Sequence, residues 1–283
     1  MVHTRPIPSS GEPLPVIGCG TYVGFDARPD EAVNERLSGV LDALFAAGGS
    51  VIDSSPMYGR AEGMVGERLA ASRASRAFIA TKVWTRGREA GIDQMRRSTA
   101  LLRTDRIDLM QVHNLVDWKV HLKTLREWKE SGRIRYLGVT HYTSSAYADL
   151  EAVLRSEALD FVQLNYSIAD RSAEQRLLPL AAERGVAVIA NLPLGSGQVL
   201  RSVQGRAIPG WAEEELSCTS WAQLLLKYVV GHTSVTCAIP GTGQAAHMAD
   251  NAMAGQGATA GEAQRARILE CWSSDRSGRL SRG

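Results

Sequence analysis

The sequence has little of what marks a disulfide-bonded, metal-binding or membrane protein. Its 283 residues include only four cysteines, without a C-x-x-C pair or a spacing typical of metal ligands. This usage is typical of reduced thiols in a cytosolic protein, so we expect a cytoplasmic location, no structural disulfide and no metal. No stretch approaches the roughly 18 consecutive apolar residues of a membrane span, and residues 1–15 lack the apolar core of a signal peptide. We therefore expect a chain that is neither secreted nor inserted in a membrane.

The sequence also has little net charge. The formal charge is +2, and Lys and Arg are spread over the whole length, so no basic patch marks binding to nucleic acid or to an anionic membrane. Hydrophobic residues at 44% and charged residues at 22% match an average soluble globular protein, which excludes a disordered or fibrous chain. We expect a small-molecule partner, no nucleic acid, no membrane, and a monomer or weak homo-oligomer.

Short apolar runs alternate with longer amphipathic stretches along the whole chain. This alternation predicts βα units around a parallel sheet. Eight strands close a barrel, and barrels of this length form one domain, so we predict an α/β fold with a single (β/α)8 TIM barrel over residues 1–283. The apolar runs are residues 16–20, 50–53, 77–82, 107–113, 136–139, 161–164, 186–190 and 235–239. The helices expected between them are 30–47, 61–71, 89–102, 121–131, 144–154, 171–184, 219–230 and 244–254.

Two segments lie outside this repeat. Residues 1–15, which are rich in Pro and Ser with SG at their centre, predict a short hairpin that plugs the bottom of the barrel. Residues 261–272 predict an extra C-terminal helix packed outside it. The main rival is an open, doubly wound sheet, but no G-x-G-x-x-G lies between the first strand and the first helix, which disfavours a dinucleotide fold of that kind.

Polar side chains follow three successive predicted strands. In barrels of this kind the functional groups lie at the C-terminal ends of the strands, where the sequence places Asp53, Tyr58, Lys82 and His113. A phenol with a pKa of about 10 is a poor acid at neutral pH, so a proton-donating Tyr58 needs a neighbour such as Lys82 to stabilise its phenolate. Asp53 would orient Lys82, and a neutral His113 would donate a hydrogen bond to a substrate carbonyl.

Each of these residues alone has a more ordinary structural explanation. A strand-end Asp is often a helix cap, and a strand-end Lys usually extends to solvent. A lone His or Tyr is more often a packed structural residue than a catalyst. The functional interpretation depends on their occurrence together, at the ends of three successive strands.

The same residues lie in motifs that resemble a bacterial member of the aldo-keto reductase superfamily, over nearly the whole chain. These motifs are GCGTY (18–22), VIDSSPMYGRAEGMVGERL (51–69), IATKVW (79–84), DLMQVH (108–113), YLGVTHY (136–142), FVQLNYS (161–167), PLGSG (193–197) and AIPGTG (238–243). The resemblance implies a catalytic tetrad of Asp53, Tyr58, Lys82 and His113. It also implies NAD(P)H-dependent reduction of aldehydes or ketones, or the reverse oxidation, by hydride transfer with Tyr58 as general acid/base and without a metal.

The resemblance further implies where a nicotinamide cofactor would lie. Thr140 and His141 occupy positions where the family usually has Ser and Asn, and Gln163 matches the third residue that holds the carboxamide. Asn191 stands where many members have an aromatic ring that stacks on the nicotinamide. The other expected contacts are Gly20, Thr21, Asp53, Leu194, Gly195, Gly197, Pro240, Gly241, Thr242, Gly243, Gln244, His247 and Asn251.

The adenosine end of this expected site departs from the family. Gly241, Gly243 and His247 occupy positions that are often basic, so only Thr242 and backbone amides at a helix N-terminus are expected to hold a 2′-phosphate. We expect NADP as the cofactor, with NAD as an alternative, and a Gly243→Arg change to sharpen the preference for NADPH.

The resemblance also suggests residues of the substrate mouth, and two other functions remain open. Tyr22, Trp84 and Asn114 are expected to line the substrate mouth. One alternative is a weakly catalytic nicotinamide-binding sensor on the same fold, favoured by Asn191 and His141. The other is a cofactor-independent barrel isomerase or lyase that uses Lys82 and Tyr58 for proton transfer.

Overall fold

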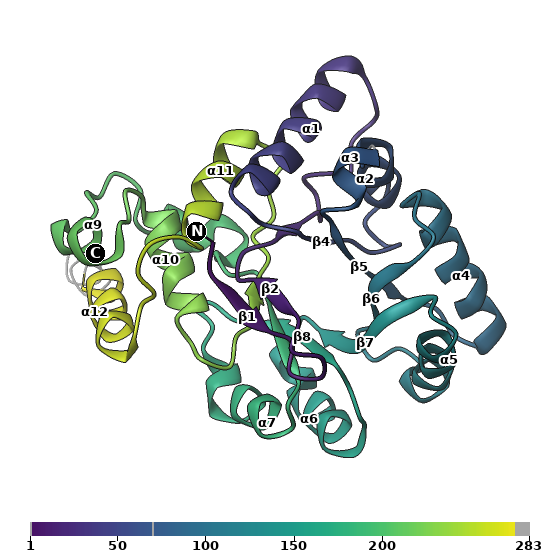
Figure 1. Ribbon diagram of the computed structural model, residues 1–283. Helices are drawn as coiled ribbons and strands as arrows, with labels where there is room; N and C mark the ends of the chain where they lie inside the picture. Colours follow the sequence, from purple (N-terminus) through teal and green to yellow (C-terminus); the bar gives the residue numbers. More distant parts are fainter. Residues whose placement is uncertain (1, 70, 275–283) are drawn as a thin grey trace, which may run out of the picture.

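The computed structural model describes residues 2–69 and 71–274, and its centre is a ring of parallel strands (Figure 1). Within the described chain, eight strands pair in sequence order, each parallel to the next. Isolated parallel bridges from Ile17 to Ala238 and from Gly20 to Gly241 close the ring. The predicted barrel is therefore confirmed. Its strands are β3 (Cys19–Gly20), β4 (Val51–Asp53), β5 (Phe78–Val83), β6 (Ile107–His113), β7 (Ile134–His141), β8 (Phe161–Asn165), β9 (Ala187–Asn191) and β10 (Cys237–Ala238).

Helices cover the outside of the ring. They are α1 (Glu31–Ala46), α2 (Ala61–Arg68), α3 (Ala71–Ala74), α4 (Arg88–Leu101), α5 (Trp118–Glu130), α6 (Tyr147–Ser156), α7 (Leu177–Glu183), α8 (Gln198–Arg201), α9 (Gly210–Leu216), α10 (Trp221–Val230), α11 (Ala245–Met253) and α12 (Glu262–Ser273). The helix predicted over residues 61–71 ends earlier, at Arg68, and α5 begins earlier than residue 121. Helices α8 and α9, in the loop after β9, were not predicted because such short segments give little helical periodicity.

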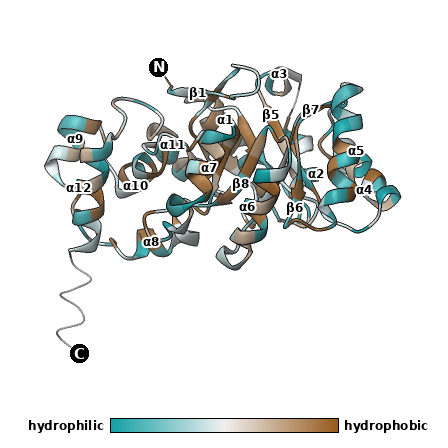
Figure 2. Ribbon diagram, turned by 90° about the horizontal axis from the view of Figure 1, so that it is seen from below, coloured by the Kyte–Doolittle hydropathy of each residue, from teal (hydrophilic) through white to brown (hydrophobic). Residues whose placement is uncertain are grey.

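Helix α1 illustrates why these sequences form helices on this barrel. The Asp30 side chain caps its N-terminus by accepting a hydrogen bond from the Val33 amide at 2.8 Å. Leu37, Leu41 and Leu44 recur at helical spacing and are fully buried in the main hydrophobic core. Figure 2 shows the same arrangement over the whole molecule, with hydrophobic strands at the centre and hydrophilic positions on the outer helices.

The N-terminal hairpin closes one end of the barrel. Strands β1 (Thr4–Pro6) and β2 (Pro13–Pro15) are antiparallel, and in Figure 1 this purple hairpin lies across the ring of strands. Ile7 and Leu14 are buried in one cluster with the aromatic rings Phe78, Tyr136 and Phe161, which come from the N-terminal parts of three barrel strands. The predicted hairpin is confirmed, and its packing leaves the C-terminal end of the barrel as the open end.

The predicted C-terminal helix is also confirmed. Helix α12 packs beside α10. Its Arg265 forms an ion pair at 2.9 Å with Glu174, which lies just before α7. Ile268 and Trp272 bury its inner face, and the Trp272 indole donates to Ser202 Oγ at 3.0 Å. Among the described residues, no helix has both the length and the apolar character needed to cross a bilayer.

Candidate active site

A cavity of about 1140 Å³ lies at the C-terminal end of the barrel. Its lining follows several strands: Tyr22 after β3, Tyr58 after β4, Tyr142 after β7 and Leu192 after β9. Asp53, Lys82 and His113 lie at its inner end, and the segment Thr242–Asn251 contributes to the part beside α11. One cavity thus joins the predicted catalytic residues to the predicted cofactor groove.

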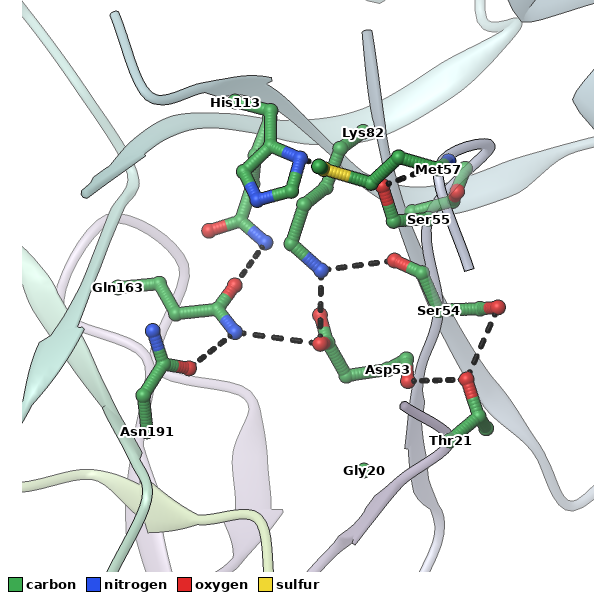
Figure 3. Close-up of polar contacts among 12 residues, drawn as sticks. Gly20, Thr21, Asp53, Ser54, Ser55, Met57, Lys82, His113, Gln163 and Asn191 are labelled. Carbon is green, nitrogen blue, oxygen red and sulfur yellow. Dashed lines mark hydrogen bonds and ion pairs between the residues drawn. The ribbon is translucent and has the colours of Figure 1, made fainter. Parts of the chain in front are cut away.

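Asp53 and Lys82 form a buried ion pair at the bottom of this cavity. Asp53 ends β4 and Lys82 lies on the neighbouring strand β5, and the Lys82 Nζ to Asp53 Oδ2 distance is 2.7 Å (Figure 3). Lys82 Nζ also donates to the Ser54 carbonyl at 2.7 Å, and both residues are only 1% exposed. Burial alone would lower the Lys82 pKa, but the charge of Asp53 and the contact with Tyr58 outweigh it and raise that pKa. Lys82 therefore stays a cation.

The Tyr58 ring packs directly against this pair. Lys82 Nζ lies 5.1 Å from the ring centroid, within the range of a cation–π contact. Burial raises the pKa of the Tyr58 phenol, whereas the positive charge of Lys82 acts in the opposite direction. The phenol is thus kept protonated by its surroundings, next to the one group that favours release of the proton.

His113 is the neutral member of the cluster. It ends β6, its Nδ1 lies 3.2 Å from Ser55 Oγ, and its ring meets Tyr58 edge-on with centroids 6.2 Å apart. Burial, followed by the charge of Lys82, lowers the pKa of His113 to about 3. The imidazole therefore has one N–H donor and no charge at neutral pH.

Glu62 is a buried carboxyl whose role was not predicted from the sequence, where it is only one position of a family motif. It is 3% exposed at the start of α2, and it accepts hydrogen bonds from Thr81 Oγ1 at 2.5 Å and Ser98 Oγ at 3.1 Å. Thr81 precedes Lys82 on β5, so Glu62 fixes the segment that follows Tyr58 to the strand that carries Lys82. A charged residue on the buried face of a predicted helix was the available signal for this role.

Most of the predicted cofactor residues lie along the cavity, but not all do. Gly195, Gly243, Gln244, His141 and Gln163 are outside its lining. The lining includes Gly20, Thr21, Asp53, Thr140, Asn191, Leu194, Gly197, Pro240, Gly241, Thr242, His247 and Asn251.

The predicted substrate residues are divided in the same way. Tyr22 lines the mouth, and its ring packs on Tyr58 with centroids 5.0 Å apart. Trp84 and Asn114 do not line the cavity. Trp84 is 42% exposed, and its backbone amide donates a hydrogen bond to Oε1 of Gln94.

The structure corrects one expectation at the start of α11. A Cβ at Gly243 would meet the Gly24 carbonyl at 2.8 Å and an Arg36 guanidinium nitrogen at 2.6 Å. The proposed Gly243→Arg change would therefore distort the loop rather than add a phosphate ligand. Arg36, from α1, already donates a hydrogen bond to the Gly243 carbonyl, so a guanidinium does lie at this loop. Sequence spacing gave no sign of it, because Arg36 and Gly243 are 207 positions apart.

Comparison with known proteins agrees with the barrel fold. A model of the aldo/keto reductase family matches residues 16–272. The chain is 29% identical over 249 residues to methylglyoxal reductase YeaE of Escherichia coli (strain K12), covering 84% of each protein. The structure is similar to an aldo/keto reductase from Klebsiella pneumoniae in complex with NADP and acetate, with a TM-score of 0.79, 24% identity and 96% of both chains covered. It is equally similar to an aldo-keto reductase of that species in complex with NADPH, at 25% identity and a TM-score of 0.79.

The fold and the site together define a barrel oxidoreductase. The chain belongs to the aldo/keto reductase family, and the resemblance seen in the sequence is confirmed.

Proposed function

We propose that this protein reduces aldehydes and ketones to alcohols with NADPH, or catalyses the reverse oxidation, with Tyr58 as the general acid/base. The observation that carries the proposal is the buried Asp53–Lys82 pair beneath the Tyr58 ring, next to a neutral His113, at the inner end of a large cavity. This arrangement supplies a proton, a charge that favours its release, and a neutral hydrogen-bond donor at one point.

The lining of the cavity supports a dinucleotide as the second substrate. Gly197, in the loop after β9, has φ +79°, a conformation that favours glycine and leaves the backbone exposed to a ligand. Thr242 Oγ1 already caps the Gln244 amide, and the next amides at the start of α11 are free of helical acceptors, which suits a phosphate. The Arg36 guanidinium at Gly243 favours NADP over NAD, as do the relatives crystallised with NADP and NADPH.

The residues of the chain divide the proton chemistry between them. The bound dinucleotide supplies the hydride. Tyr58 donates its proton to the carbonyl oxygen, and Lys82 stabilises the phenolate that results. When Ser55 Oγ–H donates to His113 Nδ1, the imidazole proton is on Nε2, which then polarises the same carbonyl oxygen.

The mouth of the cavity supports an uncharged, apolar substrate. Five of its lining residues are large apolar side chains that are more than a third exposed, namely Tyr22, Val23, Met57, Tyr142 and Leu192. Large exposed apolar side chains gathered at one opening are typical of a ligand site. We therefore expect aromatic and longer aliphatic aldehydes to be better substrates than carbonyl compounds that carry a carboxylate.

The experiment that tests the function is an oxidation assay of NADPH and of NADH with methylglyoxal, straight-chain alkanals, an aromatic aldehyde and succinic semialdehyde. We expect turnover with NADPH, and a kcat/KM at least tenfold higher for octanal than for butanal, because each buried methylene contributes up to about 0.8 kcal/mol. Tight binding of NADPH without turnover of any carbonyl would favour the sensor alternative instead.

A further inference from the structure

The hydrogen bond between Ser55 and His113 has two possible directions, and its direction decides where the imidazole proton lies. Ser55 Oγ lies 3.2 Å from His113 Nδ1, and either atom could be the donor. A neutral imidazole has one N–H donor and one acceptor nitrogen, and the bond made by one nitrogen sets the role of the other. Because Nδ1 faces Ser55, only Nε2 is left to meet a ligand in the cavity that His113 lines.

Ser55 is a fully buried residue whose hydroxyl needs both a donor and an acceptor. It is 0% exposed and lies between β4 and α2, three positions before Tyr58. Ser55 Oγ accepts from the Met57 amide at 3.4 Å (Figure 3). Among the described residues, His113 Nδ1 is the one acceptor within hydrogen-bond distance of the Ser55 hydroxyl.

The two directions of the bond differ in how many buried groups they satisfy. A proton on Nδ1 would make His113 donate to Ser55 Oγ, and the buried Ser55 hydroxyl would then have no acceptor, which is costly. With the proton on Nε2, the Met57 amide donates to Ser55 Oγ and the Ser55 hydroxyl donates to Nδ1, so each of these groups has a partner. Hydrogen bonds that run in one direction also strengthen one another. The contacts of Ser55 therefore favour the tautomer with its proton on Nε2.

The same residue closes the turn that carries Tyr58. The Tyr58 amide donates to the Ser55 carbonyl at 3.0 Å, and the Tyr58 ring meets the His113 ring edge-on. Any residue at this position could supply the backbone carbonyl, whereas the contact with His113 requires a hydroxyl. Ser55 thus joins the Tyr58 turn to the His113 ring.

We propose that Ser55 is a positioning residue that holds His113 in the tautomer with its proton on Nε2, directed at the substrate carbonyl beside Tyr58. Its effect on catalysis rests on the proposed function. Ser55 is outside the lining of the cavity, so it acts through His113 rather than on the substrate. The Nε2–H of His113 and the Tyr58 phenol then meet the same carbonyl oxygen.

The tautomer can be measured in the folded wild type without any turnover. In protein labelled with ¹⁵N in its histidine rings, proton–nitrogen correlation spectra distinguish the ring nitrogen that carries hydrogen from the one that does not. Of the signals from the six histidines, those of His113 are the ones absent from His113→Gln. At pH 7 we expect a neutral His113 with its proton on Nε2. Ser55→Ala should give a mixture of both neutral tautomers, because no hydroxyl then fixes the role of Nδ1.

The kinetics of carbonyl reduction test the positioning role. Ser55→Ala should lower kcat about tenfold, the effect of one neutral hydrogen bond, while the Kd for NADPH stays within about twofold of the wild type. The matched control is Ser167→Ala. Ser167 is 3% exposed, and its Oγ accepts from the Ala169 and Asp170 amides in its own turn after β8. This control should leave both the His113 tautomer and kcat unchanged.

The outcomes separate this inference from the proposed function. A wild-type His113 with its proton on Nδ1 would overturn the assignment. A Ser55→Ala variant that keeps the pure Nε2–H tautomer would also overturn it, and so would one with an altered tautomer but an unchanged kcat. A wild type that shows the expected tautomer but reduces no carbonyl compound would instead refute the proposed function.

Discussion

The buried Asp53–Lys82 pair leads to a prediction about the free energy of unfolding, which can be tested without any assay of activity. Asp53→Asn keeps the size of the side chain but removes its charge, and Lys82 is then an ammonium that is 1% exposed with no carboxylate beside it. Removing one partner of a buried ion pair costs about 3–5 kcal/mol. The Ser54 carbonyl still accepts from Lys82, so we expect the lower end of that range, a loss of about 3 kcal/mol in the free energy of unfolding.

The double variant Asp53→Asn, Lys82→Met is the decisive comparison. Once both charges are absent, no buried ion lacks a partner, so the double variant should be at least as stable as Asp53→Asn alone. Urea unfolding at pH 7 of the wild type, both single variants and the double variant gives the coupling energy directly. A loss below about 1 kcal/mol in Asp53→Asn, or single effects that simply add in the double variant, would refute the reasoning.

The pH dependence of the same pair follows from the raised pKa of Lys82. A cation whose pKa is higher in the folded state contributes stability below its unfolded pKa, and that stability is lost as the pH rises through the folded value. The wild type should therefore lose this contribution only in strongly alkaline solution, above pH 10.5, the ordinary pKa of lysine. The free energies of unfolding of the wild type and of the double variant should converge at that pH.

Three further predictions concern single residues. Tyr58→Phe should abolish carbonyl reduction while NADPH affinity stays within about threefold of wild type, and residual turnover within about tenfold of wild type contradicts the role of the phenol. In the wild type, His113 is neutral when folded, with a pKa of about 3, but it takes up a proton on unfolding between pH 6.5 and pH 4, so the free energy of unfolding falls over this range. His113→Gln should reduce this fall, as measured by urea unfolding at several pH values. An unchanged pH dependence counts against a neutral His113. Arg36→Leu should lower the ratio of NADPH to NADH affinity about tenfold without changing NADH binding, as measured by titration of both, and a constant ratio excludes Arg36 from the phosphate site.

Much of the fold could be predicted from the sequence because a parallel barrel repeats one local pattern. Each buried strand is a short apolar run and each helix is an amphipathic stretch, so the same strand–helix pattern occurs eight times along the chain. The shortest elements were less predictable. Helices α8 and α9 lie in the long loop after β9, where no periodic pattern develops within four to seven residues.

The cluster of Asp53, Lys82 and His113 was predictable for a related reason. Asp53 and His113 are the last residues of their strands, and Lys82 is the next-to-last residue of β5, so the topology alone brings them to one end of the barrel. The orientation of side-chain amides was not predictable. Whether Gln163 faces a ligand or Gln111 depends on which hydrogen bonds form across three strands, and sequence spacing carries no information about that choice. The same holds for Arg36, which reaches Gly243 from the opposite end of the chain.

The way in which the ring of strands is closed has a consequence for its kinetics. Strands β3 and β10 are only two residues long, and the contact between the two ends of the sheet consists of isolated bridges rather than a continuous ladder. This seam is where local opening of the ring should begin, because only three backbone hydrogen bonds cross it in the described chain, namely Gly18 N to the Ala238 carbonyl, Ala238 N to the Val16 carbonyl and Gly20 N to the Pro240 carbonyl. The cavity lies directly over it, with Gly20 on one side and Ile239, Pro240 and Gly241 on the other. A ligand in the cavity would touch both edges of the seam at once, so it should slow amide hydrogen exchange in β3 and β10 far more than in the long ladder between β6 and β7.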